Sequence, residues 1–130
     1  KGEEDGVRVG QTVVSQNFLI GKIKTVTPRT SEVILPTDPD SLIPVRTLKT
    51  SARGLLFGEF GTKAVLDKIL QSERLEKDDL LVTTGETDYK RDLIIGKIDK
   101  IEKNEVKPFQ KAEISLSLDY ARLENVFLVK

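Results

Sequence analysis

A short segment occurs twice in this chain, and it constrains the fold more than any other feature. Residues 19–26 read Leu-Ile-Gly-Lys-Ile-Lys-Thr-Val, and residues 94–101 read Ile-Ile-Gly-Lys-Ile-Asp-Lys-Ile. Four of the eight positions are identical, and the shared glycines, Gly21 and Gly96, lie 75 residues apart. Apolar and polar residues alternate after each glycine, as in a strand with one buried face. This separation is too long for a solenoid repeat and fits two small related β units.

Glycines inside the expected strands predict bends. A glycine has no side chain to pack, so within a strand it usually marks a bulge or a barrel corner. A second glycine-rich run, residues 53–61, predicts a tight hairpin or a bulged strand. It lacks the Gly-Lys-Ser/Thr ending of a phosphate-binding loop. The glycines expected to form structural turns or bends are Gly21, Gly54, Gly58, Gly85 and Gly96.

Short β-rich runs separated by glycine and proline predict an all-β protein. The expected strands cover residues 7–14, 18–26, 32–35, 43–48, 64–70, 80–84, 93–101, 112–118 and 126–129. Residues 64–70 also fit one face of a helix, and we favour a strand followed by a loose turn. A single helical turn capped by Asp119 is expected at 119–124. Together with the repeat, this pattern predicts two small β-barrel lobes of about six strands each.

The expected organisation has three parts. Residues 1–6 form a polar, disordered N-terminal tail. Residues 7–52 form the first β-barrel lobe, with return strands that the C-terminus could supply. Residues 53–130 form the second β-barrel lobe and the closing strands.

Composition argues against several classes of function. Lysine plus arginine equals aspartate plus glutamate at 21 each, so the chain lacks the basic field on which nucleic-acid binding depends. With no cysteine and no histidine, disulfides, thiol nucleophiles and the commonest general base are excluded. The paired carboxylates Asp38/Asp40 and Asp78/Asp79 lie in polar segments where turn capping is expected. We therefore predict no enzyme activity, no catalytic residue, no metal and no cofactor.

Three hypotheses about function remain open from the residues alone. The first is a binding or scaffolding module that acts through sheet edges and apolar loop tips. The second is a nucleic-acid- or ribosome-associated β-barrel adaptor, supported thinly by aromatic residues among lysines and arginines. The third is a degenerate hydrolase barrel without a base. The candidate partner-binding residues are Phe57, Phe60 and Tyr89, which turn glycines and charges surround, although all three could equally be buried.

The chain resembles the β-rich extracytoplasmic domain of the rod-shape-determining MreC family. In the first half the resemblance rests on Val13-Val14, Gly21-Lys22-Ile23, Ser31-x-Val33-x-Leu35, Thr37-Asp38, Pro44-Val45 and Arg53-Gly54-Leu55-x-x-Gly58. In the second half it rests on Asp79-x-Leu81-Val82-Thr83-Thr84-Gly85, Ile95-Gly96-Lys97-Ile98, Ala112-x-Ile114 and Leu123-x-x-Val126. The family usually has Gly-Asp where this chain has Asp78-Asp79. It also has an aromatic-Pro-x-Gly loop where this chain keeps only Tyr89.

The resemblance implies two six-stranded barrel lobes and a non-enzymatic scaffold of the bacterial cell-elongation machinery, which synthesises peptidoglycan and maintains rod shape. It implies self-association and three partners: a class B penicillin-binding protein, MreD and RodA. It also implies a location on the outer face of the cytoplasmic membrane, anchored by an upstream helix that is not in this sequence. No nucleic-acid partner is implied.

Overall fold

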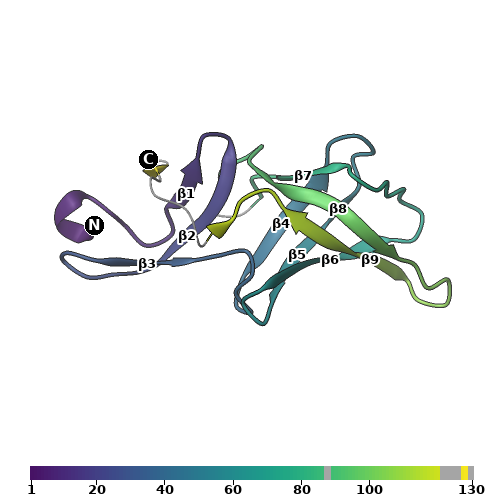
Figure 1. The fold of residues 1–130 in the computed structure, drawn as a ribbon, viewed down its shortest axis with the longest axis horizontal. Helices are drawn as coiled ribbons and strands as arrows, with labels where there is room; N and C mark the ends of the chain where they lie inside the picture. The colour runs from purple at the N-terminus through teal and green to yellow at the C-terminus, as the bar shows by residue number, and fades with distance from the viewer. Residues whose placement is uncertain (87–88, 121–126, 129–130) are drawn as a thin grey trace.

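The computed structural model describes residues 1–86, 89–120 and 127–128, and shows an all-β protein (Figure 1). The elements are the 3-10 helix η1 (Glu3–Asp5) and the strands β1 (Thr12–Ser15), β2 (Phe18–Val26), β3 (Ser31–Ile34), β4 (Leu42–Thr47), β5 (Arg53–Glu59), β6 (Lys63–Leu70), β7 (Leu80–Thr83), β8 (Ile94–Glu102), β9 (Phe109–Leu116) and β10 (Phe127–Leu128). The prediction of a strand rather than a helix at 64–70 is confirmed by β6.

Strands β4 to β9 close into an antiparallel barrel. Their order is β8-β7-β4-β5-β6-β9, and β9 pairs back onto β8. Alternate residues point inward, and Ile43, Leu56, Leu66, Leu81 and Ile98 are fully buried among them. Closure leaves no free edge in these six strands, so interactions with other molecules must use the outer face or the loops.

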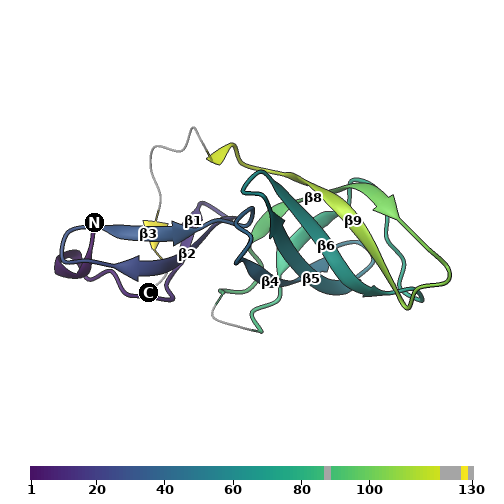
Figure 2. The ribbon, with the colours of Figure 1, turned by 90° about the horizontal axis from the view of Figure 1, so that it is seen from below.

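The N-terminal strands form a smaller sheet beside the barrel. Its order is β10-β1-β2-β3, and Phe18 in β2 pairs in parallel with Ile94 in β8. Among the described residues this sheet is open, so the expected closed first lobe is not seen. Figures 1 and 2 show the sheet and the barrel side by side along the long axis, with both termini at the sheet end. Its own small core contains Val7, Val13, Ile20 and Ile23.

Strand β4 and residues 1–6 differ from the organisation expected from the sequence. Strand β4 belongs to the barrel, pairing with β5 and β7, although residues 7–52 are assigned above to the first lobe. Residues 1–6, expected to be a disordered tail, contain η1. The Glu3 amide donates to the Thr27 carbonyl at 2.8 Å and the Glu4 amide donates to the Pro28 carbonyl at 3.0 Å. Most of the helical turn expected at 119–124 lies outside the described residues.

The two glycines of the repeated segment lie under neighbouring backbone. A Cβ atom built on Gly21 would overlap the carbonyl oxygen of Ile34 in β3, and one built on Gly96 would overlap that of Ser115 in β9. Each strand therefore passes so close to its neighbour at this point that no side chain fits. A Cβ atom built on Gly54 or on Gly58 would likewise overlap backbone atoms of a neighbouring segment. Gly85 has a left-handed φ of 81°.

Candidate interaction surface

Apolar side chains cover the outer face of β4, β5 and β6. Because Ile43 and Val45 point into the barrel, the residues that alternate with them point outward. The cross-strand register then places Leu42 opposite Phe57, Phe57 opposite Val65, and Pro44 opposite Leu55. We call Leu42, Pro44, Leu55, Phe57 and Val65 the β4–β6 face.

The five side chains of the β4–β6 face lie on the surface of the barrel and not in its core. Leu42 is 48% exposed and the other four residues are half-buried, so all five keep apolar surface in contact with solvent. Contiguous apolar surface of this kind on a soluble domain commonly marks an interaction site. Sequence reasoning found Phe57 but missed the other four residues, because only the pairing register shows that they lie together.

Two arginines border the face at one end. Arg46 and Arg53 lie directly opposite each other on β4 and β5, an arrangement that is destabilising for like charges. The segment that follows β7 neutralises both. Arg46 Nη2 lies 3.0 Å from Asp92 Oδ1, and Arg53 Nη1 lies 2.7 Å from Glu86 Oε1. A pocket of about 270 Å³ opens beside them, lined by Pro44, Val45, Arg53, Gly54, Leu55, Lys68, Thr84 and Glu86.

Phe60 projects from the opposite end of the face, at the tip of the β5–β6 hairpin. Its side chain is 86% exposed. Phe60 and Gly61 have φ values of 55° and 72°, as in a type I′ turn, and the Gly61 amide donates to the Thr37 carbonyl at 2.9 Å. A bulky residue is disfavoured at positive φ. The hairpin therefore holds an exposed aromatic ring in a strained conformation.

Replacing Phe60 with asparagine should stabilise the protein. Asn-Gly is the preferred pair in a type I′ turn, and Phe60 loses little packing because it is exposed. We expect Phe60→Asn to raise the free energy of unfolding by about 1 kcal/mol, measured by urea denaturation. An unchanged or lower stability would show that the Phe60 ring makes stabilising contacts in the isolated chain.

Tyr89, the third candidate contact residue, is buried, which corrects its expected place on a partner surface. It is 4% exposed and belongs to the main core cluster with Val14 and Leu93. Two hydrogen bonds hold the next residue, Lys90: Thr83 Oγ1 donates to the Lys90 carbonyl at 2.6 Å, and the Lys90 amide donates to Thr12 Oγ1 at 3.1 Å. The Tyr89 ring is thereby fixed at the junction of sheet and barrel.

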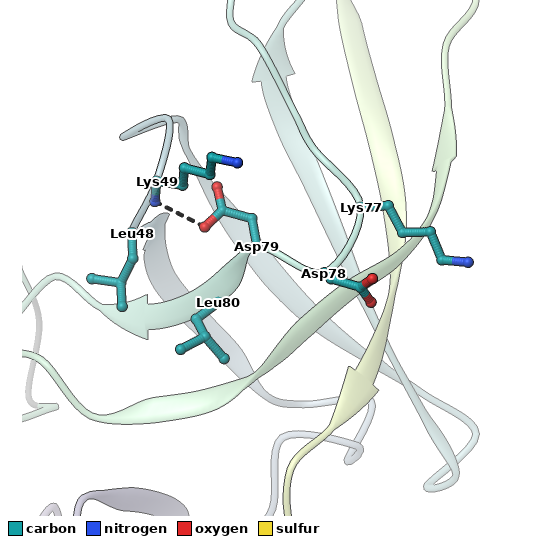
Figure 3. A pocket seen from close by; sticks show the side chains of 6 residues that line it. All are labelled: Leu48, Lys49, Lys77, Asp78, Asp79 and Leu80. Atoms are coloured by element: carbon teal, nitrogen blue, oxygen red, sulfur yellow. Dashed lines mark hydrogen bonds between the residues drawn. The ribbon is translucent and has the colours of Figure 1, made fainter.

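A second pocket, of about 390 Å³, lies where the segment that follows β4 meets the segment that leads into β7 (Figure 3). Leu48 and Leu80 form its apolar part. The Asp79 carboxylate accepts hydrogen bonds from the amides of Lys49 at 2.8 Å and Thr50 at 3.2 Å, tying two loops together. Asp78 has a left-handed φ of 68°, a conformation that glycine adopts more readily than aspartate. Because its buried carboxylate is used internally, we assign this pocket a structural role.

Among the residues that the structure describes, the side chains of Glu76 and Tyr120 have clearly shifted pKa values. A hydrogen bond from Lys49 lowers the pKa of Glu76, whose carboxylate lies 2.9 Å from Lys49 Nζ. Burial raises the pKa of Tyr120 to about 12, so its hydroxyl stays protonated at neutral pH. That hydroxyl donates to the Leu19 carbonyl at 3.4 Å. Tyr120 lines a pocket of about 420 Å³ with Leu35, Thr37, Gly61, Thr62, Leu116, Leu118 and Asp119.

The residues that the structure describes contain no cluster of three or more acidic side chains placed to hold a metal ion. The same part of the chain contains no helix with the length and apolar character needed to cross a bilayer.

A closed six-stranded barrel, an adjoining sheet and an apolar outer face define an all-β domain of the barrel class. A family model described as "Rod shape-determining protein MreC, barrel core" matches residues 1–130. The chain belongs to this MreC family of cell shape-determining proteins.

Relatives and solved structures agree with this assignment. The "Cell shape-determining protein MreC" of Haemophilus influenzae is 41% identical over 65% of this chain and 24% of its own length. That of Cereibacter sphaeroides is 32% identical over 95% of this chain and 39% of its own length. The chain therefore spans a quarter to two fifths of these relatives.

Three solved structures share the fold. A crystal structure of MreC from Pseudomonas aeruginosa has a TM-score of 0.87 and 27% identity, over 100% of this chain and 85% of that one. A complex between PBP2 and MreC from Helicobacter pylori has a TM-score of 0.76 and 22% identity, over 90% and 74%. The "major periplasmic domain from the cell shape-determining filament MreC" has a TM-score of 0.75 and 18% identity, over 91% and 75%.

Proposed function

We propose that this chain is a non-enzymatic scaffold domain of the cell-elongation machinery and that it binds a class B penicillin-binding protein through the β4–β6 face. The observation that carries this proposal is the contiguous apolar surface formed by Leu42, Pro44, Leu55, Phe57 and Val65. Burial of such a surface on a partner is the main favourable term in protein association. The Helicobacter pylori complex, in which a protein of the same fold is joined to PBP2, supports the choice of partner.

We also propose a wider setting for the domain, which family membership supports. The domain acts outside the cytoplasmic membrane, as the periplasmic neighbour of the same fold does by its description. There it assembles with MreD and RodA and associates with copies of itself. For the whole protein, we propose that a segment upstream of residue 1 anchors the domain to the cytoplasmic membrane.

We further propose that the repeated segment reflects a duplicated β unit. Gly21 and Gly96 each lie in a nine-residue strand, β2 or β8, which pairs with the strand before it and the strand after it. Each glycine also lies under the carbonyl oxygen of the following strand. On this proposal, the small sheet and the closed barrel derive from the same β unit, and the sheet has fewer strands. The sheet is then the first lobe and the barrel is the second lobe.

A binding measurement tests the proposed function. The extracytoplasmic part of a class B penicillin-binding protein from the same organism is passed over immobilised chain 1–130 in biolayer interferometry. Saturable binding is expected, with a dissociation constant in the micromolar range or tighter, as for a standard-size interface. Absence of binding, under conditions where the Helicobacter pylori pair binds, would overturn the proposal.

A further inference from the structure

We infer that the partner covering the β4–β6 face carries a carboxylate that binds between Arg46 and Arg53, in place of Asp92 and Glu86. This inference rests on the proposed function, because it describes the partner of the same face. It concerns an anion-binding site at the border of that face, with the chemistry of an acidic side chain in an otherwise apolar segment.

The arrangement of the arginines is the first observation. Arg46 and Arg53 occupy one cross-strand pair, which is the next outward-facing pair after that of Pro44 and Leu55. Two guanidinium groups side by side repel each other unless an anion lies between or beside them. A planar guanidinium group also binds carboxylates in a bidentate manner, so two of them form a ready site for one carboxylate.

The present counter-charges are held weakly, which is the second observation. The Asp92 and Glu86 side chains are 56% and 53% exposed, that of Arg53 is 67% exposed, and that of Arg46 is 23% exposed. Because at least one member of each ion pair is open to solvent, the pairs contribute little to stability, and a partner can exchange them at small cost. In the free protein the two carboxylates therefore occupy the positions that we assign to the partner's acidic group.

The other described charges nearby balance one another. Lys68 lines the pocket beside Arg53, and Arg91 Nε lies 3.4 Å from Asp92 Oδ2. Two carboxylates accept backbone amides here: Asp67 Oδ1 accepts the Lys68 amide at 2.7 Å, and Glu73 Oε2 accepts the Arg53 amide at 3.1 Å. Displacement of Asp92 and Glu86 would leave a cationic border beside an apolar face.

The spacing of the face indicates the form of the partner segment. Successive outward-facing pairs on a strand are about 7 Å apart, because each residue advances the strand by about 3.4 Å. An extended segment has the same two-residue repeat. It would therefore place apolar side chains over the Phe57 and Leu55 positions and a carboxylate at Arg53. The fitting partner is an extended segment with alternating apolar residues followed or preceded by an acidic residue.

The test uses short peptides and the ¹⁵N-labelled chain 1–130. The probes are acetyl-Leu-Thr-Val-Thr-Glu-amide, its reversed order, and the same two peptides with glutamine in place of glutamate. Titration is followed by ¹H–¹⁵N correlation spectra, which report millimolar affinities. We expect the shifted amides to lie in β4, β5 and β6. We also expect at least one glutamate peptide to bind about fivefold more tightly than its glutamine counterpart, the upper end of the range for a solvent-exposed ion pair.

Two variants move the affinity in opposite directions. Arg46→Gln/Arg53→Gln should remove the preference for glutamate. Glu86→Gln/Asp92→Asn should tighten glutamate binding about threefold or more, because it removes the internal competitors. The control Asp99→Asn/Glu102→Gln removes the same net charge from exposed positions on β8 and should leave affinity unchanged.

The outcomes separate this inference from the proposed function. Equal binding of glutamate and glutamine peptides, shifts outside the β4–β6 face, or no binding of any peptide would overturn the acidic-segment inference. So would equal tightening by the control variant. The proposed function fails separately, if the penicillin-binding protein itself does not bind chain 1–130.

Discussion

Replacing Gly96 with alanine is expected to lower the free energy of unfolding of the chain by about 3 kcal/mol, the upper range for an overpacked core site. The added methyl group would overlap the carbonyl oxygen of Ser115, and it would also lie 3.0 Å from the Ile114 Cγ2 atom. Backbone cannot rotate aside as a flexible side chain can. Strands β8 and β9 would have to separate at Gly96, where β8 also pairs with β7.

Gly10→Ala is the matched control for Gly96→Ala. Gly10 has a left-handed φ of 90°, but a Cβ atom there would meet nothing within 4 Å. Its replacement should therefore cost only about 1 kcal/mol, the conformational penalty alone. Both variants are compared by urea denaturation monitored by circular dichroism. If Gly96→Ala were no more destabilising than Gly10→Ala, the close approach of β8 and β9 would be wrong.

Replacing Tyr89 with alanine is expected to cost about 3 kcal/mol or more of stability, as for other buried aromatic residues. Tyr89 belongs to one buried core cluster that includes Val14 and Leu19 of the sheet and Leu93 and Ile95 of the barrel unit. The ammonium group of Lys22 also lies 4.9 Å from the ring centroid. The substitution would empty the junction between the two units.

The same variant distinguishes a core role of Tyr89 from a partner-binding role. A core residue changes the urea midpoint, whereas an exposed contact residue changes partner binding and leaves the midpoint in place. Tyr89→Phe is the control, because it keeps the ring and should retain most of the stability. A Tyr89→Ala variant as stable as the wild type would contradict the buried position of the ring.

Local patterns in the sequence predicted the strands well, because alternation and chain breakers are local signals. The expected strand 18–26 coincides with β2, which ends shortly before Pro28. Local patterns in the sequence could not predict which strands pair when the strands are far apart in the chain. Strand β4 joins the barrel through its register with β5 and β7, and no feature of residues 43–48 indicates which neighbours they choose.

The candidate site was predicted only in part for the same reason. Phe57 and Phe60 lie on or beside the β4–β6 face, but Tyr89 is buried although charged residues surround it in the sequence. Lys90, the residue after Tyr89, is held by hydrogen bonds with nearby Thr83 and with Thr12, and Thr12 is 78 residues from Lys90. The opposed arginines become visible only when the register of β4 and β5 is known.

The most direct test of the scaffold account measures how one substitution on the β4–β6 face changes binding to the class B penicillin-binding protein. Phe57→Asp places a charge at the centre of the face, and Val9→Asp places one at a 66% exposed apolar position outside it. By biolayer interferometry, Phe57→Asp is expected to weaken binding at least 30-fold, about the 2 kcal/mol of an interface hot spot, and Val9→Asp to leave it unchanged. Equal affinities for the wild type and Phe57→Asp would contradict the account.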